Sequence, residues 1–419
     1  MKKLAWLVGC VLALSVVGMA AEPGKLIIWA DDTRTPVFDE LGKAYTDATG
    51  IPVEVVELAY EDIRGQFVTA APTGEGPDII IGAHDWIGEL AANGLLAELE
   101  LAAEVTAKFD AVSLEAFTYG ALYGIPYARE GIALVYNKNL VTDPPATWEG
   151  LLTLARELTD PTTPQYGFVV QNPDPYHSFP FMSALGGYIF GTDAEGKLAP
   201  CDVGLDNAGA VAGYQLFDQL FEEGLIPAGL DWNTWTGLFA DGRIAMVITG
   251  PWAIGIANQA GVEVGVAPIP SLPAPAEPWP PAGTELPVIP DPDAPGHFVP
   301  KPFVGVQGVM VSAFSPNLAI AQDFLVNYFV SKDTMLELYE RDPRIPTYLP
   351  AYEEVQDDPI LAGFADSIAN ATPMPNIPEM AAVWGAWTDA LELIANQSVE
   401  PAEGMPQAAD AVREALECE

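Results

Sequence analysis

Aromatic residues lie beside acids or tight turns at four points where a strand is expected to end. The four clusters are Trp29–Asp32, Asp85–Trp86, Asp174–Tyr176 and Gly250–Trp252. Aromatic rings stack on the apolar faces of neutral sugars, and carboxylates form the stronger, charge-assisted hydrogen bonds with sugar hydroxyls. In α/β sheets, ligands bind at the carboxyl ends of the strands. The clusters therefore predict a site for a neutral, hydroxyl-rich ligand in a cleft between two lobes.

Other site chemistries find little support in the sequence. The segment Gly191–Leu198 nearly fits a phosphate-binding loop, but Leu198 stands where a hydroxyl is required, and Pro200 where a helix should run. His84 and His177 could each act as a base, yet without a cysteine or metal partner we expect both to be hydrogen-bonded structural residues. Three histidines and three cysteines leave little for a metal centre, so no metal or cofactor is expected.

The composition excludes several classes of partner. The 419 residues include 58 Asp and Glu against 17 Lys and Arg, which gives a net charge of −41. Such a chain repels nucleic acid, anionic membrane surfaces and anionic substrates. Half of the residues are hydrophobic, so the chain is expected to fold, and its length suffices for two or three domains.

Strands and helices alternate in the first part of the chain. Strands are expected over 25–30, 51–58 and 78–82, with helices over 35–50 and 61–71 between them. Thr35-Pro36 is typical of a helix start, and Gly50 is typical of a helix end. This βαβαβ order predicts a parallel sheet with right-handed crossovers.

The alternation returns later, so two α/β units are expected. The second unit has strands over 132–136, 167–171 and 245–249 and helices over 147–158 and 207–223. Helices are also expected over 317–328, 333–339, 380–395 and 405–416. The segment 271–300 holds ten prolines, which suit neither a helix nor a sheet interior. It is expected to be an extended surface excursion, either a spacer or, through Trp279 and His297, a partner contact.

The N-terminus has the form of an export signal. A basic start, an apolar stretch and small residues near its end predict a signal peptide over 1–21. An uncleaved anchor helix and lipidation at Cys10 are the alternatives. The protein is therefore expected to be exported. The cysteines that remain after cleavage, Cys201 and Cys418, are free to pair, but their spacing does not decide whether they do.

Six stretches of the chain carry a family resemblance: Gly76–Asp85, Tyr136–Glu149, Asp202–Gly209, Gly250–Ala253, Pro302–Val306 and Met374–Met380. They keep their order and spacing from Gly24 to Leu416, apart from the proline-rich segment. In these stretches the chain resembles the periplasmic maltose and maltodextrin-binding proteins of ABC importers.

The resemblance implies an α/β, bilobal periplasmic-binding-protein fold with a hinge of several crossings. The first lobe would comprise 25–130 and 270–335, with the proline-rich segment 271–300 as an insertion. The second lobe would comprise 131–269 and 336–419. The sugar would bind between the lobes, which close around it.

In the first lobe the resemblance implies sugar-binding roles for Asp32, Arg34, Asp85 and Trp86. Asp32 and Arg34 match an acid and a basic residue in a loop that is about one residue shorter here. Trp86 replaces a frequent arginine, and Gly82 stands where some relatives have tryptophan, so one stacking ring is expected to have moved. A solvated turn and a helix cap are the structural alternatives for Asp32 and Asp85.

The other implied ligand-binding residues are Glu130 near the hinge, Asp174, Tyr176, Trp252, Met374 and Trp384 in the second lobe, and Tyr60 and Glu61 at the outer positions. Tyr176, Trp252 and Trp384 match stacking rings, for which core packing is the alternative. Asp174 replaces a glutamate that is one methylene longer, so its contact is expected to lengthen or to pass through water.

The implied function is to bind maltose or maltodextrins and deliver them to a membrane ABC transporter. The protein would act as a monomer that partners the permease and its ATPase subunits, by binding rather than catalysis. Two alternatives stay open. One is a solute-binding protein for another disaccharide of the trehalose or sucrose type, which Trp86 and Asp174 would favour. The other is a secreted glycosidase that recruits two carboxylates.

Overall fold

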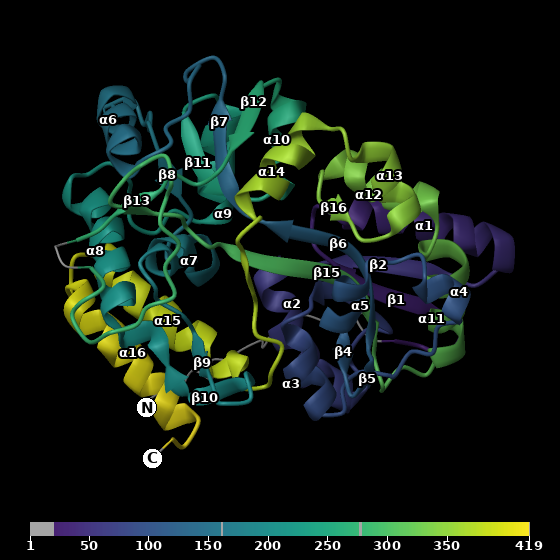
Figure 1. The fold of residues 1–419 in the computed structure, drawn as a ribbon. Helices are drawn as coiled ribbons and strands as arrows, with labels where there is room; N and C mark the ends of the chain where they lie inside the picture. The colour runs from purple at the N-terminus through teal and green to yellow at the C-terminus, as the bar shows by residue number, and fades with distance from the viewer. Residues whose placement is uncertain (1–20, 161, 276–278, 419) are drawn as a thin grey trace, which may run out of the picture.

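The computed structural model describes residues 21–160, 162–275 and 279–418. The signal peptide expected over 1–21, with its lipidation alternative at Cys10, lies outside these residues apart from its last position. Figure 1 shows two α/β lobes side by side, one around a large sheet and one around a smaller sheet. The bilobal α/β architecture that the sequence predicts is therefore confirmed. No helix in the described ranges is both long and apolar enough to cross a membrane.

The larger sheet has seven strands in the order β16–β6–β15–β3–β1–β2, with β17 paired to β15. Their bounds are β1 Leu26–Ala30, β2 Val53–Glu57, β3 Ile79–Ala83, β6 Gly124–Gly131, β15 Phe303–Val311, β16 Ile345–Pro346 and β17 Thr372–Pro373. Strands β1, β2 and β3 are parallel, as predicted, but β15 runs antiparallel to both β3 and β6. The sheet is mixed rather than parallel because the chain returns to it late in the sequence.

Two crossover helices connect the parallel strands of this sheet, α1 (Thr35–Thr49) and α2 (Tyr60–Ala70). Pro36 lies in the first turn of α1. Gly50 ends α1 with a φ of 77°, a left-handed conformation that costs glycine little. Arg34 occupies the cap position without a capping hydrogen bond, so its side chain is available for other contacts.

The smaller sheet has the order β12–β7–β11–β8. Its strands are β7 Ala133–Asn137, β8 Val169–Val170, β11 Met246–Thr249 and β12 Val264–Ala267. Strand β7 is antiparallel to β11 and β12, whereas β8 and β11 are parallel. The helices of this lobe include α6 Trp148–Leu158, α7 Pro175–Ala184, α8 Ala208–Glu222, α10 Trp252–Ala260, α15 Met380–Ala395 and α16 Pro401–Ala415.

Shorter elements complete the two lobes. The other helices are α3 Trp86–Ala92, α4 Ala103–Thr106, α5 Ala111–Ala116, α9 Trp232–Ala240, α11 Leu318–Phe324, which continues as a π-turn over Leu325–Phe329, α12 Lys332–Arg341, α13 Leu349–Val355 and α14 Pro359–Ser367. Single helical turns lie at Ala71–Thr73 and Gly204–Asp206. The short strands are β4 Thr118–Tyr119, β5 Ala121–Leu122, β9 Phe190–Thr192, β10 Leu198–Val203, β13 Leu272–Pro273 and β14 His297–Phe298.

The last quarter of the chain contributes to both lobes. Strands β16 and β17 belong to the larger sheet, whereas α15 and α16 pack with α8 in the other lobe. The resemblance implies that everything after residue 336 lies in the second lobe. The difference covers α12 and α13, which pack in the lobe of the larger sheet, and the strands β16 and β17. Strands of only two residues are too short for any periodic signal in the sequence.

Two strands of the larger sheet carry glycines beneath the buried ring of Phe117. A Cβ added at Gly124 would come within 2.4 Å of this ring, and one at Gly308 within 2.3 Å. The glycines let an aromatic ring pack directly on the backbone of β6 and β15. They also weaken the strand pattern of these two segments, neither of which is expected as a strand from the sequence.

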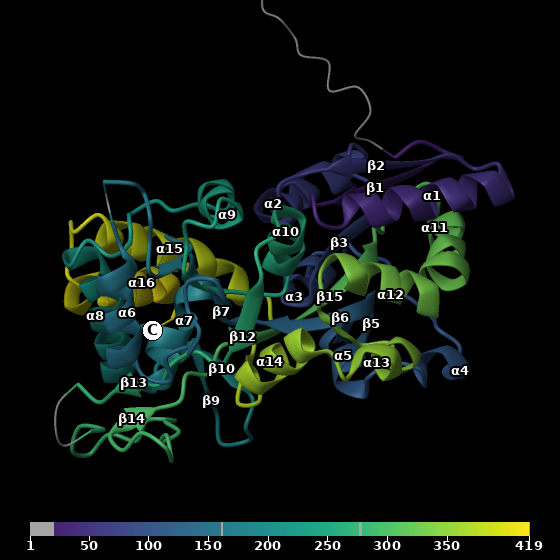
Figure 2. The same cartoon turned by 90° about the horizontal axis from the view of Figure 1, so that it is seen from above.

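The proline-rich segment 271–300 includes a small hairpin of β13 and β14. His297 Nε2 lies 2.8 Å from Oε2 of Glu149 on α6. The resemblance implies an insertion in the first lobe, whereas the hairpin lies beside helices of the lobe built on the smaller sheet (Figure 2).

A disulfide joins Cys201 on β10 to Cys418 after α16, with 5.6 Å between their Cα atoms. The pairing that the sequence leaves open is therefore present. Near the same end, Arg413 donates hydrogen bonds to the Asp206 carboxylate and to the Val203 carbonyl oxygen. The covalent bond and these hydrogen bonds fix the C-terminal helix against the β9–β10 hairpin.

Candidate functional site

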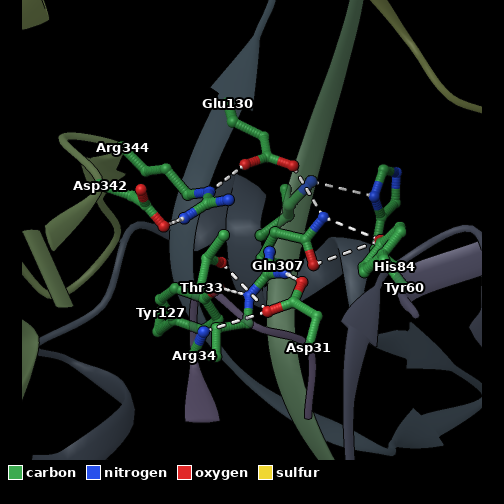
Figure 3. Close-up of polar contacts among 11 residues, drawn as sticks. Asp31, Thr33, Arg34, Tyr60, His84, Tyr127, Glu130, Gln307, Asp342 and Arg344 are labelled. Atoms are coloured by element: carbon green, nitrogen blue, oxygen red, sulfur yellow. Dashed lines mark hydrogen bonds and ion pairs between the residues drawn. The ribbon is translucent and has the colours of Figure 1, made fainter. Parts of the chain in front are cut away.

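A connected group of buried polar side chains lies at the edge of the larger sheet that faces the other lobe. We call it the polar network, and Figure 3 shows it. Its members are Asp31, Arg34, Tyr60, Tyr127, Glu130, Gln307, Asp342 and Arg344. They come from the end of β1, from α2, from β6 and β15, and from the loop before β16, so chain segments far apart in sequence meet here.

Arg34 forms one half of this network. Its guanidinium pairs with the Asp31 carboxylate and donates from Nε to the Tyr127 hydroxyl. The guanidinium carbon lies 5.3 Å from the centroid of the Tyr60 ring, within the range of a cation–π contact. The neighbouring Asp31 raises the pKa of Arg34, against the lowering effect of burial. Arg34 is therefore held rigidly in its charged form.

Glu130 and Arg344 form the other half of the network. Glu130 accepts a hydrogen bond of 2.7 Å from Gln307 Nε2, and its second oxygen pairs with Nε of Arg344. Arg344 Nη1 donates to Asp342 Oδ2 over 2.8 Å. Both oxygens of Glu130 are thus engaged within the protein.

Asp32, a predicted ligand, is exposed next to this network. Its pKa is raised by partial burial and by the negative charges of Asp31 and Glu57. It is Asp31, one residue earlier, that pairs with Arg34.

Asp85 and Trp86 lie at the end of β3, both buried. Asp85 occupies the cap position of α3, but its side chain accepts no capping hydrogen bond. Burial raises the pKa of Asp85, although nearby His84 and Arg64 and a hydrogen bond from Trp384 oppose this effect. Its carboxylate is therefore directed to the boundary between the lobes rather than to the backbone of its own helix.

Trp86 packs against Tyr60, with 5.4 Å between the ring centroids. Glu61, the other predicted outer residue, is exposed at the start of α2. The side chains of Trp86 and Tyr60 form an aromatic pair next to Arg34, on the same edge of the larger sheet as the polar network.

Aromatic rings of the second lobe gather opposite this edge. Tyr176 lies 6.1 Å from Trp252 and 6.0 Å from Phe303, measured between ring centroids. Trp384 lies 6.1 Å from Phe303 and stacks on buried Trp387. Tyr176, Trp252 and Trp384 are each only half-buried, unlike the core rings behind them.

Asp174 caps α7 in this lobe. Its Oδ1 accepts from the His177 backbone amide at 3.1 Å, and its Oδ2 accepts from Gln171 Nε2 at 2.8 Å. Burial alone would raise the pKa of Asp174, but nearby His177 and hydrogen bonds from His177 and from the Tyr176 backbone amide lower it. Asp174 thus has a clear structural role at the start of the helix that carries Tyr176.

The two histidines considered as bases differ in their surroundings. His84 Nδ1 accepts from the Val306 amide at 3.1 Å, and Nε2 lies 3.2 Å from the Met374 carbonyl oxygen, which matches the structural role predicted for it. Burial lowers the pKa of His84 and favours this neutral form. The His177 ring is also buried, and its Nδ1 lies 3.0 Å from Asp174 Oδ2, which supports the structural role predicted for it.

Met374 is buried beside the hinge strand β15. Its terminal methyl carbon lies 3.1 Å from the position that a Cβ would take at Gly305. His84 holds its carbonyl oxygen, as described above, so this segment is tied to the larger sheet. The side chain borders Glu130, whose Cγ lies 3.8 Å from the same position at Gly305.

Several residues of this site carry no clear signal in the sequence. They are Tyr127, Gln307, Asp342 and Arg344, whereas Phe303 falls within the stretch Pro302–Val306 that carries the family resemblance. The only hint is the run Asp342-Pro-Arg344, an acid and a base separated by a turn residue. Pairing of distant strands brings these residues to the site, and a single sequence does not reveal such pairing.

One acidic cluster has a spacing that could hold a cation. The carboxylates of Asp218, Glu222 and Glu400 have oxygens within 4.8 Å of one another. Glu222 and Glu400 are exposed, and the cluster lies on α8 and at the start of α16. It is separate from the polar network and the aromatic rings.

Residues 40–363 match the bacterial extracellular solute-binding protein family. The chain belongs to this family. The solute-binding protein is 31% identical to a maltotriose-binding protein of Pyrococcus abyssi, over 88% of this chain and 77% of the relative. It is 28% identical to a galactooligosaccharide-binding protein of Bacillus subtilis, over 94% and 90% of the two chains. A solved structure of the Thermus thermophilus maltotriose-binding protein with maltotriose superposes with a TM-score of 0.83 at 32% identity, covering 93% of this solute-binding protein and all of that chain.

Proposed function

We propose that this solute-binding protein takes up maltose and longer maltodextrins in the cleft between its lobes. The observation that carries the proposal is the Tyr176 hydroxyl, which is buried without a hydrogen bond within the described residues. The carboxylates of Glu130, Asp174 and Asp85 lie near enough to influence its pKa, which burial raises. An unused donor among aromatic rings and charged acceptors suits a ligand with apolar faces and hydroxyl edges. The relatives that bind maltotriose support the same ligand class.

The proposal assigns the sugar-binding roles to both lobes. The residues are Asp32, Arg34, Asp85, Trp86, Glu130, Asp174, Tyr176, Trp252, Met374 and Trp384. Rings of the second lobe stack on the glucosyl unit, and charged groups of the first lobe bind its hydroxyls. The closed form is favoured because one ligand makes both sets of contacts at once. A few charge-assisted hydrogen bonds, offset by the cost of association, allow micromolar binding, about −8 kcal/mol.

We further propose that the closed protein is a monomer that docks on a membrane permease with ATPase subunits. The extracellular family supports export, and the signal sequence supports a periplasmic location. Binding without catalysis is proposed because Glu130 is already engaged in an ion pair and Asp174 caps a helix. Release of reducing ends from maltodextrin would contradict this part of the proposal.

Titration of tryptophan fluorescence tests the ligand. Maltose, maltotriose and maltoheptaose are compared with trehalose, sucrose and cellobiose. A saturable change with the α-1,4-glucans alone is expected, since Trp86, Trp252 and Trp384 lie in or beside the cleft. No response from folded protein to any sugar would overturn the proposal.

A second ligand class is favoured by a specific observation, the 28% identity with the galactooligosaccharide-binding relative over nearly the whole chain. Trp86 and Asp174 differ from the residues that the resemblance leads us to expect, and both could alter specificity. They could also favour a disaccharide of the trehalose or sucrose type. Galactobiose is therefore added to the titration. Saturation by galactobiose or by a control sugar would keep the binding role and reassign the substrate.

A further inference from the structure

Arg344 lies where the two lobes meet, at the end of the loop that precedes β16. Its side chain is only 5% exposed. Glu130 holds Nε and Asp342 holds Nη1, from two different chain segments (Figure 3). Because a guanidinium is planar, two anchored nitrogens fix the direction of the third.

The third nitrogen, Nη2, forms no hydrogen bond within the described residues. The guanidinium carbon lies 5.8 Å from the ring centroid of Trp252, which belongs to the opposite lobe. Trp252 lies close over Gly250, where a Cβ would come within 2.1 Å of its ring. Arg344 is thus a first-lobe cation placed against an aromatic platform of the second lobe.

A sugar ring that stacks on an indole presents its hydroxyls at the rim of the stack. The direction of a donor fixed beside the same indole determines which of these hydroxyls it can reach. The carboxylates of Glu130 and Asp342 offset the desolvation cost of Arg344 in the sugar-free protein, so the donor is preorganised. Lysine carries the same charge but lacks the planar fork that fixes the direction.

We propose that Arg344 is a specificity-determining sugar-binding residue. Its Nη2 donates a hydrogen bond to one hydroxyl of the glycosyl unit that stacks on Trp252. Glu130 and Asp342 hold the guanidinium in place. This inference rests on the proposed function, because it assumes that a sugar occupies the cleft.

Arg344→Lys tests the inference, with Arg156→Lys as the matched control. Arg156 also pairs through its fork, with Nε and Nη2 at 2.7 and 2.6 Å from the Glu223 carboxylate, but on the exposed surface. Calorimetric titration with maltotriose should show affinity lowered about 10- to 100-fold in Arg344→Lys, the range for a hydrogen bond to a charged group. Arg156→Lys should bind like the wild type.

A set of singly deoxygenated maltoses separates direct contact from structural support. One deoxy sugar should bind the wild type more weakly than maltose does. Arg344→Lys should bind this deoxy sugar and maltose equally well, because the substitution and the missing hydroxyl each remove the same hydrogen bond. The inference is overturned if the affinity losses from Arg344→Lys and from each deoxygenation are additive for every deoxy sugar. It is also overturned if Arg344→Lys lowers the melting temperature of the sugar-free protein but leaves its sugar affinity unchanged.

A spectroscopic measurement keeps the test valid if Arg344→Lys does not fold. In wild-type protein labelled with ¹⁵N-arginine, maltotriose should shift the side-chain signals of Arg344 and leave those of Arg156 unchanged. Unchanged Arg344 signals at saturation overturn the inference alone. A wild-type protein that binds no sugar at all overturns the proposed function, and this inference with it.

Discussion

Trp86 lies directly over Gly82, four residues earlier, at the end of β3. A Cβ added at Gly82 would come within 1.9 Å of the Trp86 ring. Gly250 and Trp252 show the same relationship in the other lobe, at 2.1 Å. Each lobe therefore uses a glycine to bring a tryptophan down onto the carboxyl end of a strand. Both tryptophans are among the residues proposed to bind the sugar.

Gly82→Ala should displace the Trp86 ring and weaken sugar binding. The buried ring has little room to move, so we also expect the protein to be about 1–3 kcal/mol less stable. Fluorescence titration and urea denaturation measure the two effects. Gly65→Ala is the control, because no atom lies within 4 Å of a Cβ at that helical position. Equal affinity for Gly82→Ala and wild type would show that Trp86 does not contact the ligand.

Asp85→Asn should raise the stability of the sugar-free protein at neutral pH and lower its affinity for sugar. Burial raises the pKa of Asp85, so folding disfavours its charged form. The stability contribution of the protonated form is fully present below the ordinary Asp pKa and is lost as pH rises through the raised value. The stabilities of Asp85→Asn and wild type should therefore be similar in acid. The difference between them should grow as pH rises from the ordinary Asp pKa through the raised value. Melting temperatures across pH measure this, with exposed Asp241→Asn as the control; equal curves at every pH would contradict it.

Glu130→Ala should destabilise the protein strongly. The change leaves Arg344 without one of its two carboxylates and Gln307 without an acceptor, in a buried setting. Removing one partner of a buried ion pair costs about 3–5 kcal/mol. Urea unfolding measures the loss. The control is Glu223→Ala, which removes an exposed pair and should cost about 0–1 kcal/mol. Similar losses in both variants would mean that the polar network does not contribute to stability as argued.

Replacing both Cys201 and Cys418 by serine should lower stability without changing sugar affinity. The disulfide constrains the unfolded chain, and removing a native disulfide typically costs about 2–5 kcal/mol. Both cysteines lie away from the aromatic rings of the cleft. Urea unfolding of the variant, and of the wild type with and without reductant, gives the comparison. A wild type whose stability does not respond to reductant would be the contrary result.

The sequence predicts those parts of the fold that have local signals. Strand β1 and helices α1 and α15 lie within a residue or so of their expected bounds, because apolar periodicity, Pro36 and Gly50 mark them. Strands β6 and β15 lack such a signal, since glycines at 124 and 308 make room for Phe117. Their antiparallel pairing with each other is what makes the larger sheet mixed.

The residues of the candidate site likewise fall into those with a local signal in the sequence and those without one. Asp85, Trp86, Tyr176 and Trp252 stand at strand ends, where both the clusters and the family resemblance indicate a ligand. Arg344 reaches the site through the pairing of β16 with β6 and through its ion pair with Glu130, 214 residues away in the chain. The composition around Arg344 is ordinary, so no local pattern predicts its position.

The Cys201–Cys418 bond joins residues 217 positions apart in the sequence and closes a covalent ring, which contains strands of both sheets. A mechanical pull on the two ends of the chain therefore cannot straighten β15 and β16, even after the lobes have come apart. The contour length hidden inside the ring is about 700–800 Å for a fully extended chain. Under load, the oxidised molecule extends only through the segment that precedes Cys201, while the loop closed by the disulfide stays unstretched.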